Sequence, residues 1–182
     1  LVGGHGIHQA LRVGQSLTDQ LVVSSQDGTA SATLQVTIQG SNDGPRATAD
    51  TTTGDENQTL TIDVLANDTD GDNGAVLTVF SAAAPSGKGT ATVQGNKVVF
   101  DPGTAFDHLA AGQSEDVVVT YTIKDLYGAE SSSSVTITLT GTDDGPIARP
   151  DTGSGHENET LTIDVLANDS TPDRMAPLTL MA

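Results

Sequence analysis

The nine residues from Leu60 to Asp68, LTIDVLAND, occur again without change from Leu161 to Asp169. The same spacing of 101 residues carries Asn42-Asp43-Gly44-Pro45 onto Asp143-Asp144-Gly145-Pro146. A repeat of this period is typical of chains built from tandem modules, each the size of a small domain. We therefore expect an array of similar units rather than a single globular fold.

A second match fixes where each unit begins and ends. Gly14-Gln15-Ser16 corresponds to Gly112-Gln113-Ser114, and the alternating stretch 34–38 corresponds to 135–139. These matches predict three units: residues 1–43 form the C-terminal part of a first module, 44–144 a complete module, and 145–182 the N-terminal part of a third. Only the middle module is predicted to close a full fold by itself.

The middle module has the pattern of a β-sandwich. Its apolar residues are mainly Val, Leu, Ile and Ala, Thr and Ser are abundant, and the whole chain has three Phe, two Tyr and no Trp, which favours strands over helices. Seven alternating or continuously apolar runs are predicted as strands: 46–53, 59–65, 77–83, 89–94, 97–101, 116–124 and 132–140. Seven short strands in about 100 residues predict an all-β, immunoglobulin-like sandwich.

The net charge and the absence of cysteine exclude several classes of binding partner and stabilising feature. The formal net charge is −17 and the chain has no cysteine. Nucleic acid and anionic membranes are therefore poor partners, and no apolar run approaches the roughly 20 residues that a membrane helix needs. Because no disulfide or thiolate site is available, the rigidity of the fold must come from packing or from ions bound by oxygen ligands.

The densest group of such ligands is the loop from Asn67 to Asn73. Asp68, Asp70 and Asp72 alternate along it, so that several carboxylates can converge on one ion. Calcium takes six to eight hard oxygen ligands, which this composition suits. An EF-hand is disfavoured because Asn73 occupies the sixth position, where that loop requires glycine, and Val79 occupies the twelfth.

Four segments together identify a family resemblance. They are the NDGP linker, the opening DENQTLTIDVLANDTDGD, the hairpin GTATVQGNKVVFDP and the closing GQSLTDQLVVSSQDGTASATLQVTIQGSNDGP. These segments resemble the cadherin-like and VCBS-type tandem repeats of large bacterial RTX-type surface adhesins. The resemblance implies a secreted or cell-surface extender module, stiffened by calcium at the junctions between modules and serving cell adhesion or biofilm formation.

By analogy with cadherin-like junctions, the resemblance also implies which residues bind calcium. Asp43, Asp68 and Asp70, helped by Asn42, are expected between the first two modules, and Glu56 is expected to join the carboxylates of the next linker. The third unit departs from the pattern, since Thr171 and Pro172 replace Asp70 and Gly71. The full predicted ligand set is Asn42, Asp43, Glu56, Asp68, Asp70, Asp72, Asp143, Asp144, Glu157 and Asp169. The alternative is that these side chains only form turns and caps.

No catalytic constellation accompanies these motifs. His156-Glu157-Asn158-Glu159-Thr160 begins like the HExxH of a zinc protease but ends in Thr, so we predict no enzymatic activity. The expected partners are neighbouring repeats of the same chain, with a cell-surface or polysaccharide ligand bound through other parts of the parent protein. Two alternatives stay open: a carbohydrate- or protein-binding sandwich, for which Tyr127 is the candidate aromatic platform, and an accessory domain of a large extracellular enzyme.

Overall fold

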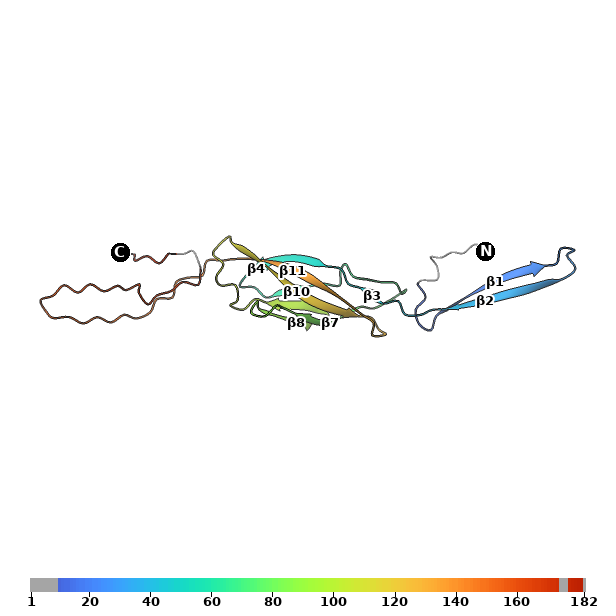
Figure 1. Cartoon of the computed structure of the whole chain (residues 1–182), viewed down its shortest axis with the longest axis horizontal. Helices are drawn as coiled ribbons and strands as arrows, with labels where there is room; N and C mark the ends of the chain where they lie inside the picture. The colour runs from blue at the N-terminus through green and yellow to red at the C-terminus, as the bar shows by residue number, and fades with distance from the viewer. Residues whose placement is uncertain (1–9, 174–176, 182) are drawn as a thin grey trace.

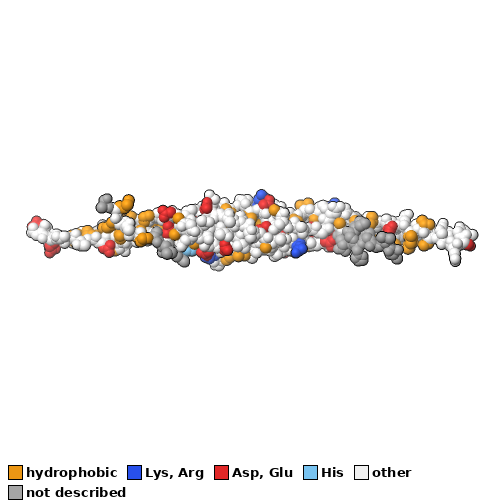
Figure 2. All heavy atoms as spheres, turned by 90° about the horizontal axis from the view of Figure 1, so that it is seen from above, with side chains coloured by type: hydrophobic (Ala, Val, Ile, Leu, Met, Phe, Trp, Pro, Cys, Tyr) orange, Lys and Arg blue, Asp and Glu red, His pale blue; other side chains and the backbone are white. Residues whose placement is uncertain are grey.

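The computed structural model describes residues 10–173 and 177–181. Figure 1 shows three parts in series along one long axis: an N-terminal β-hairpin, a central sandwich and an extended C-terminal segment. Figure 2 shows the same rod from above, with acidic side chains distributed along it and few basic ones. Within the described residues, no helix has the length and apolar character needed to cross a membrane.

The central sandwich is built from two sheets. The first contains β4 (Asp50–Asp55), β11 (Glu130–Thr140), β10 (Ser114–Lys124) and β7 (Thr78–Ala83), adjacent in that order. The second contains β5 (Leu60–Ile62), β9 (Lys97–Asp101) and β8 (Thr90–Gln94). Neighbouring strands are antiparallel except β4 and β11, which run parallel. The predicted all-β, immunoglobulin-like sandwich is confirmed.

The first predicted strand, 46–53, is divided into two. Its start forms β3 (Pro45–Arg46), which pairs with a short strand not predicted from the sequence, β6 (Thr69–Asp70), while its end joins β4 in the first sheet. Side chains interrupt the strand between these pieces. The Thr48 amide donates to Asp68 Oδ1 over 2.7 Å, and Asn67 Nδ2 donates to the Ala49 carbonyl over 3.1 Å. Backbone groups bound in this way are not available to a sheet ladder.

The core lies between the two sheets and contains only residues of the central part. Along β10, Val117, Val119, Tyr121 and Ile123 are buried and alternate with more exposed neighbours. This period-2 pattern is the one that indicated the strand in the sequence. The remaining buried apolar residues are Ile62, Val64, Val79, Val98, Phe100, Phe106, Leu109, Val135, Ile137 and Leu139.

A tight turn joins β8 to β9. Its central residues, Gly95 and Asn96, have φ angles of 56° and 62°, as a two-residue turn of type I′ requires. Asn96 also holds the turn against the neighbouring sheet. Its Oδ1 accepts from the Val79 amide over 2.7 Å, and its Nδ2 donates to the Leu77 carbonyl over 3.2 Å.

The two end segments contain much less paired structure. The hairpin consists of β1 (Ser16–Ser24) and β2 (Ser31–Gln39), joined in one continuous antiparallel register. The C-terminal segment has a single described β-bridge, between Ile147 and Ser170. This bridge lies 101 residues after the pairing of Arg46 with Thr69, so the opening geometry of the central sandwich recurs there. The division into modules at residues 43 and 144 stays a prediction.

Candidate metal centres

Five polar residues meet where the hairpin joins the sandwich. We call Asn42, Asp43, Asp70, Asp72 and Asp125 the first acidic cluster. Asn42 Nδ2 donates to Asp125 Oδ2 over 2.6 Å, and the Asp43 amide donates to Asp72 Oδ2 over 3.1 Å. The linker, the loop after β6 and the turn between β10 and β11 thus converge, although Asp43 and Asp125 are far apart in sequence.

Local structure explains why the loop after β6 reaches the linker. The pairing of β3 with β6 places Asp70 opposite Pro45, directly after the linker. Asp70 Oδ1 then accepts from the Asp72 amide over 2.8 Å, an Asx-type turn that directs the Asp72 side chain inward. A Cβ added at Gly71 would lie 3.1 Å from Asp43 Oδ2, so a side chain there would require Asp43 to shift. The sequence DTDGD therefore folds as a tight loop around these carboxylates.

The first acidic cluster borders a small cavity. Its volume is about 10 Å³, roughly the space of one water molecule or one ion. Its polar lining consists of Arg12, Asn42, Asp70, Asp72, Asp125 and Tyr127. Hydrogen bonds from Asn42 and from the Ala129 and Tyr127 amides outweigh the effect of burial, and so they hold the pKa of Asp125 below its usual range.

A second group lies at the opposite end of the sandwich. It consists of Glu56, which contacts the linker at Thr142, and of the pair formed by Asp144 of the same linker and Asp173, and we call these three residues the second acidic cluster. Glu56 is completely buried, and its Oε1 accepts from the amide and hydroxyl of Thr142 over 2.7 and 3.1 Å. The Asp144 amide donates to Asp173 Oδ2 over 3.2 Å. This contact repeats that of Asp43 with Asp72 after 101 residues.

Both clusters contain buried oxygens that lack a hydrogen-bond donor. Among the described residues, seven buried side-chain atoms have no partner, and each is a carboxylate or amide oxygen: Asn42 Oδ1, Glu56 Oε2, Asp68 Oδ2, Asp70 Oδ2, Asp72 Oδ1, Asp144 Oδ2 and Asp173 Oδ1. None of the four described ion pairs includes any of these residues. A buried acceptor without a donor is costly, and a cation is the partner that carboxylates can share.

Carboxylates alone do not complete either cluster. Within residues 10–173 and 177–181, no three Asp, Glu or His side chains are gathered closely enough to form a ligand set by themselves. An ion would also need amide oxygens, backbone carbonyls or water. Calcium accepts all three, whereas a site made only of side chains is more typical of zinc. The donor set therefore fits a hard cation.

Two predicted ligands, Asp68 and Asp169, hold the backbone of their own segment. Asp68 Oδ1 lies 2.7 Å from the Thr48 amide and 3.4 Å from the Tyr121 hydroxyl. Asp169 Oδ1 accepts in the same way from the Arg149 amide, over 2.7 Å. Burial raises the pKa of Asp68 although these bonds oppose the shift. Because Asp68 Oδ2 stays unpartnered, its role as a ligand remains a prediction.

Two other predicted ligands, Asp143 and Glu157, are exposed. Asp143 nevertheless lines one cavity together with Asp144 and Asp169, whereas no contact among the described residues brings Glu157 to either cluster. Conversely, the structure adds Asp125 and Asp173, which are buried. Asp173 carried a signal in the sequence, because it repeats Asp72 after 101 residues. The only signal for Asp125 was its match with Asp27, which lies in the turn of the N-terminal hairpin. Neither the spacing nor the local sequence pattern indicated that the turn between β10 and β11, which contains Asp125, reaches the linker.

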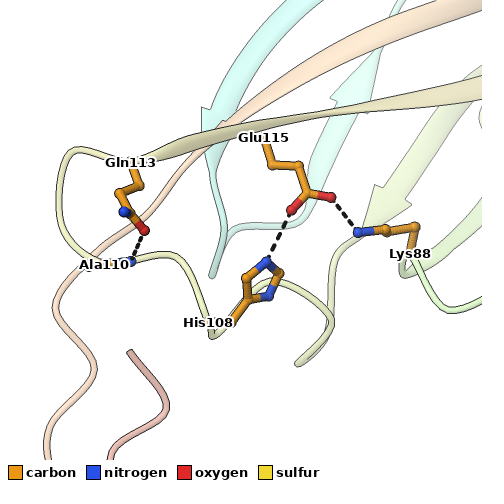
Figure 3. A network of polar contacts seen from close by, with 5 residues as sticks. All are labelled: Lys88, His108, Ala110, Gln113 and Glu115. Atoms are coloured by element: carbon orange, nitrogen blue, oxygen red, sulfur yellow. Dashed lines mark hydrogen bonds and ion pairs between the residues drawn. The ribbon is translucent and has the colours of Figure 1, made fainter. Parts of the chain in front are cut away.

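A third polar network lies on the side of the sandwich, and unlike the two acidic clusters it contains basic side chains. Glu115 pairs with Lys88 through one oxygen and with His108 through the other, the latter over 3.0 Å (Figure 3). The bond from Lys88 lowers the pKa of Glu115, and the contact with His108 adds to this effect. In the same view the Ala110 amide donates to Gln113 Oε1 over 3.1 Å. These contacts fasten the loop before β10 to the sandwich, and the basic groups already neutralise Glu115.

Comparison with known proteins identifies a family. A family model described as "Bacterial Ig domain" matches residues 42–138, more than half of the chain. Among solved structures, the crystal structure of mouse protocadherin-24 EC1-3 is similar, with a TM-score of 0.31 and 19% sequence identity over 70% of this chain. The match covers 44% of that protocadherin chain. A search of curated protein sequences gave no match.

Proposed function

We propose a function that starts from the family: the chain belongs to the bacterial Ig domain family, a non-catalytic type of module that is common in surface and extracellular proteins. We propose that the chain is an extender segment of a secreted bacterial adhesin and that calcium stiffens it. The adhesin class is that of the cadherin-like and VCBS-type repeats of RTX-type proteins, which serve cell adhesion or biofilm formation. The observation that carries the proposal is the set of seven buried oxygens without donors, at the two clusters and at Asp68.

At the first junction, Asn42, Asp43, Asp70, Asp72 and Asp125 would hold the ion. Asn42 Oδ1, Asp70 Oδ2 and Asp72 Oδ1 are buried and unpartnered, so they offer coordination without breaking a hydrogen bond. At the second junction, Glu56, Asp144 and Asp173 offer one such oxygen each. Bound calcium supplies positive charge that these carboxylates share.

The mechanism is mechanical. The segment before the hairpin already contacts the sandwich beside the first cluster. There the Asn73 amide donates to the Ala10 carbonyl over 3.1 Å, and the Tyr127 hydroxyl lies 3.4 Å from the Val13 carbonyl. Without a cation, several carboxylates repel one another at this contact. Neutralising them removes the repulsion and couples the linker to two loops of the sandwich, so that the joint resists bending.

The exposed aromatic side chains give little support to a carbohydrate-binding face. Phe80 is 57% exposed, but Lys124 Nζ lies 3.2 Å from its ring centroid. Tyr127, the platform expected from the sequence, is half exposed but contacts the Val13 carbonyl at the junction. The two rings therefore already have contacts within the chain, and the extender role is the function that the geometry supports best.

Thermal unfolding of wild type and Asp72→Asn, in calcium, magnesium and chelator, tests this function. An ion that binds only the folded state stabilises it by about 2.7 kcal/mol at one hundred times its Kd. We expect a clear rise in wild-type Tm with calcium, a smaller one with magnesium because of its stricter octahedral geometry, and a strongly reduced calcium effect in Asp72→Asn.

Asp63→Asn is the matched control. Its carboxylate is exposed and pairs with Lys97 at 3.3 Å, away from both clusters. This variant should keep the full calcium effect. If calcium shifts the Tm of wild type no more than magnesium does, or if Asp72→Asn and Asp63→Asn respond equally, the calcium role of the first cluster is wrong.

A further inference from the structure

A basic side chain, Arg12, lines the cavity of the first acidic cluster. Asp72 lines the same cavity, is only 7% exposed, and has an Oδ1 atom without a hydrogen-bond donor. The guanidinium lies beside the turn that follows Asp72, since a Cβ added at Gly74 would be 3.8 Å from Arg12 Nη1. None of the four ion pairs among the described residues includes Arg12. Its positive charge is therefore close to the carboxylates but leaves their unpartnered oxygens free.

The backbone on both sides of Arg12 is fixed to the sandwich. Ala10 accepts a hydrogen bond from the Asn73 amide over 3.1 Å, and the Val13 carbonyl lies 3.4 Å from the Tyr127 hydroxyl. Arg12 itself is partly buried between these two contacts. The position of its side chain at the edge of the cavity thus follows from the fold of the segment before β1.

The same turn is found before β10, with alanine in place of arginine. The Gln15 amide donates to the Arg12 carbonyl over 3.0 Å, and the Gln113 amide donates to the Ala110 carbonyl over 2.9 Å. In both turns the glutamine side chain bonds back, since Gln15 Oε1 accepts from the Arg12 amide over 3.3 Å and Gln113 Oε1 from the Ala110 amide over 3.1 Å. The turn therefore forms without an arginine side chain, and Arg12→Ala should keep the backbone intact.

We propose that Arg12 sets the calcium affinity of the first junction by acting as a covalently attached counter-charge. This inference rests on the proposed function. The first acidic cluster contains four carboxylates, of which a divalent ion balances two charges and Arg12 one more. In the ion-free junction Arg12 reduces the repulsion among the carboxylates, and in the calcium-bound junction it repels the ion. Both effects weaken calcium binding, so the junction requires more calcium and keeps more of its order without it.

Isothermal titration of calcium into the full chain tests the affinity. The repulsion between a unit charge and a divalent ion a few side-chain lengths away corresponds to a Kd that is about three- to tenfold lower in Arg12→Ala than in wild type. The difference should decrease at high ionic strength. Arg12→Lys keeps the charge and should bind calcium as wild type does.

Lys97→Ala is the matched control, because it removes the same charge from the pair that Lys97 forms with Asp63, away from both clusters. It should leave the Kd within about twofold of wild type, since salt screens a distant charge. A double-mutant comparison then assigns the effect to the first cluster. In a chain that already carries Asp72→Asn, Arg12→Ala should no longer change the calcium titration.

Thermal unfolding provides a readout of the ion-free junction. In chelator, Arg12→Ala should have a lower Tm than Arg12→Lys, because its carboxylates have lost their counter-charge. The rise in Tm from chelator to calcium should be larger in Arg12→Ala than in wild type, since tighter binding stabilises the folded state more. Lys97→Ala should show the wild-type rise.

The outcomes distinguish this inference from the proposed function. If wild type binds calcium but Arg12→Ala and Lys97→Ala have the same Kd and the same rise in Tm, the role of Arg12 is overturned and the proposed function stands. If wild type binds no calcium, the proposed function fails and the role of Arg12 is overturned with it.

Discussion

Four acidic side chains are buried in the described part of the chain: Glu56, Asp72, Asp125 and Asp173. Each of the four accepts a hydrogen bond from a residue of one of the two linkers. Carboxylates are rarely buried without a compensating partner, and here hydrogen bonds from the linkers account for only part of their acceptor capacity. The positions of these residues therefore support the proposal that ions bind at the junctions.

Glu56 gives a prediction for which its counterpart in the repeat, Glu157, serves as the control. Its carboxylate holds the linker at Thr142, so Glu56→Ala removes two charge-assisted hydrogen bonds and should lower the free energy of unfolding by about 2 kcal/mol in calcium. Glu157, 101 residues later, is exposed, and Glu157→Ala should change the stability by less than about 0.5 kcal/mol. Urea unfolding measures both. Equal effects would contradict the assigned role of Glu56.

Tyr121 gives a prediction about alkaline pH. Burial and the nearby Asp50 carboxylate, whose Oδ2 is 2.9 Å from the hydroxyl, raise the pKa of Tyr121 well above its usual value. A raised pKa in the folded state contributes stability that is complete below the unfolded value of about 10 and is lost as pH rises above it. Wild-type stability should therefore fall in this range.

The variant Tyr121→Phe should lose most of this alkaline fall, at the cost of about 1 kcal/mol at neutral pH for the missing hydrogen bond. Tyr127→Phe is the control variant, because it removes a tyrosine hydroxyl that lies at the junction rather than beside Asp50. Chemical unfolding between neutral pH and about pH 11 measures the two slopes. Identical slopes for wild type and Tyr121→Phe would contradict this assignment.

At the scale of the elements, two substitutions in the turn between β8 and β9 can distinguish the contribution of backbone conformation to stability from that of side-chain hydrogen bonds. Asn96→Gly keeps the positive φ that the turn requires but loses both side-chain bonds to the neighbouring sheet. Asn96→Ala loses the bonds and also strains the backbone, which costs about 1 kcal/mol more. We expect stability to decrease in the order wild type, Gly, Ala by thermal unfolding. An Ala variant as stable as the Gly variant would exclude the turn type described here.

The same elements show how far the sequence could predict the structure. Strands β7 to β11 were predicted within about two residues, because buried aliphatic residues alternate along them or run continuously and Gly or Asn marks their turns. The interruption of 46–53 was missed because the groups that cause it, Asn67 and Asp68, belong to a later loop. Local periodicity carries no information about contacts of this kind.

The candidate sites were predicted in part for the same reason. Asn42, Asp43, Asp70 and Asp72 could be found because a linker motif and an alternating acidic loop lie close together in the sequence. Asp125 lies 83 residues from Asn42, its hydrogen-bond partner, so only the folded hairpin brings the two together. Asp143 and Glu157 were included through the family resemblance and the repeat. Both are exposed, whereas their counterparts Asn42 and Glu56 are partly or fully buried, so equivalent positions need not have equivalent surroundings. The roles of Asp143 and Glu157 as ligands stay predictions.

On the scale of the whole molecule, the described part of the chain is a slender rod, and its hydrophobic core lies in the central sandwich (Figures 1 and 2). The junctions carry the acidic clusters, and the net charge of −17 favours extended, mutually repelling segments unless cations bind. Stiffness is then a property of the linkers rather than of the sandwich. The central claim concerns how the parts move relative to one another.

Small-angle X-ray scattering of the monomer, isolated by inline gel filtration and recorded in calcium and then in chelator, tests that claim most directly. We predict that calcium gives a longer maximum dimension and the scattering of a stiff rod, and that chelation gives a broader, more flexible ensemble, which Asp72→Asn reproduces even in calcium. If the curves in calcium and in chelator coincide, the bacterial Ig sandwich stands but its junctions are not calcium-stiffened.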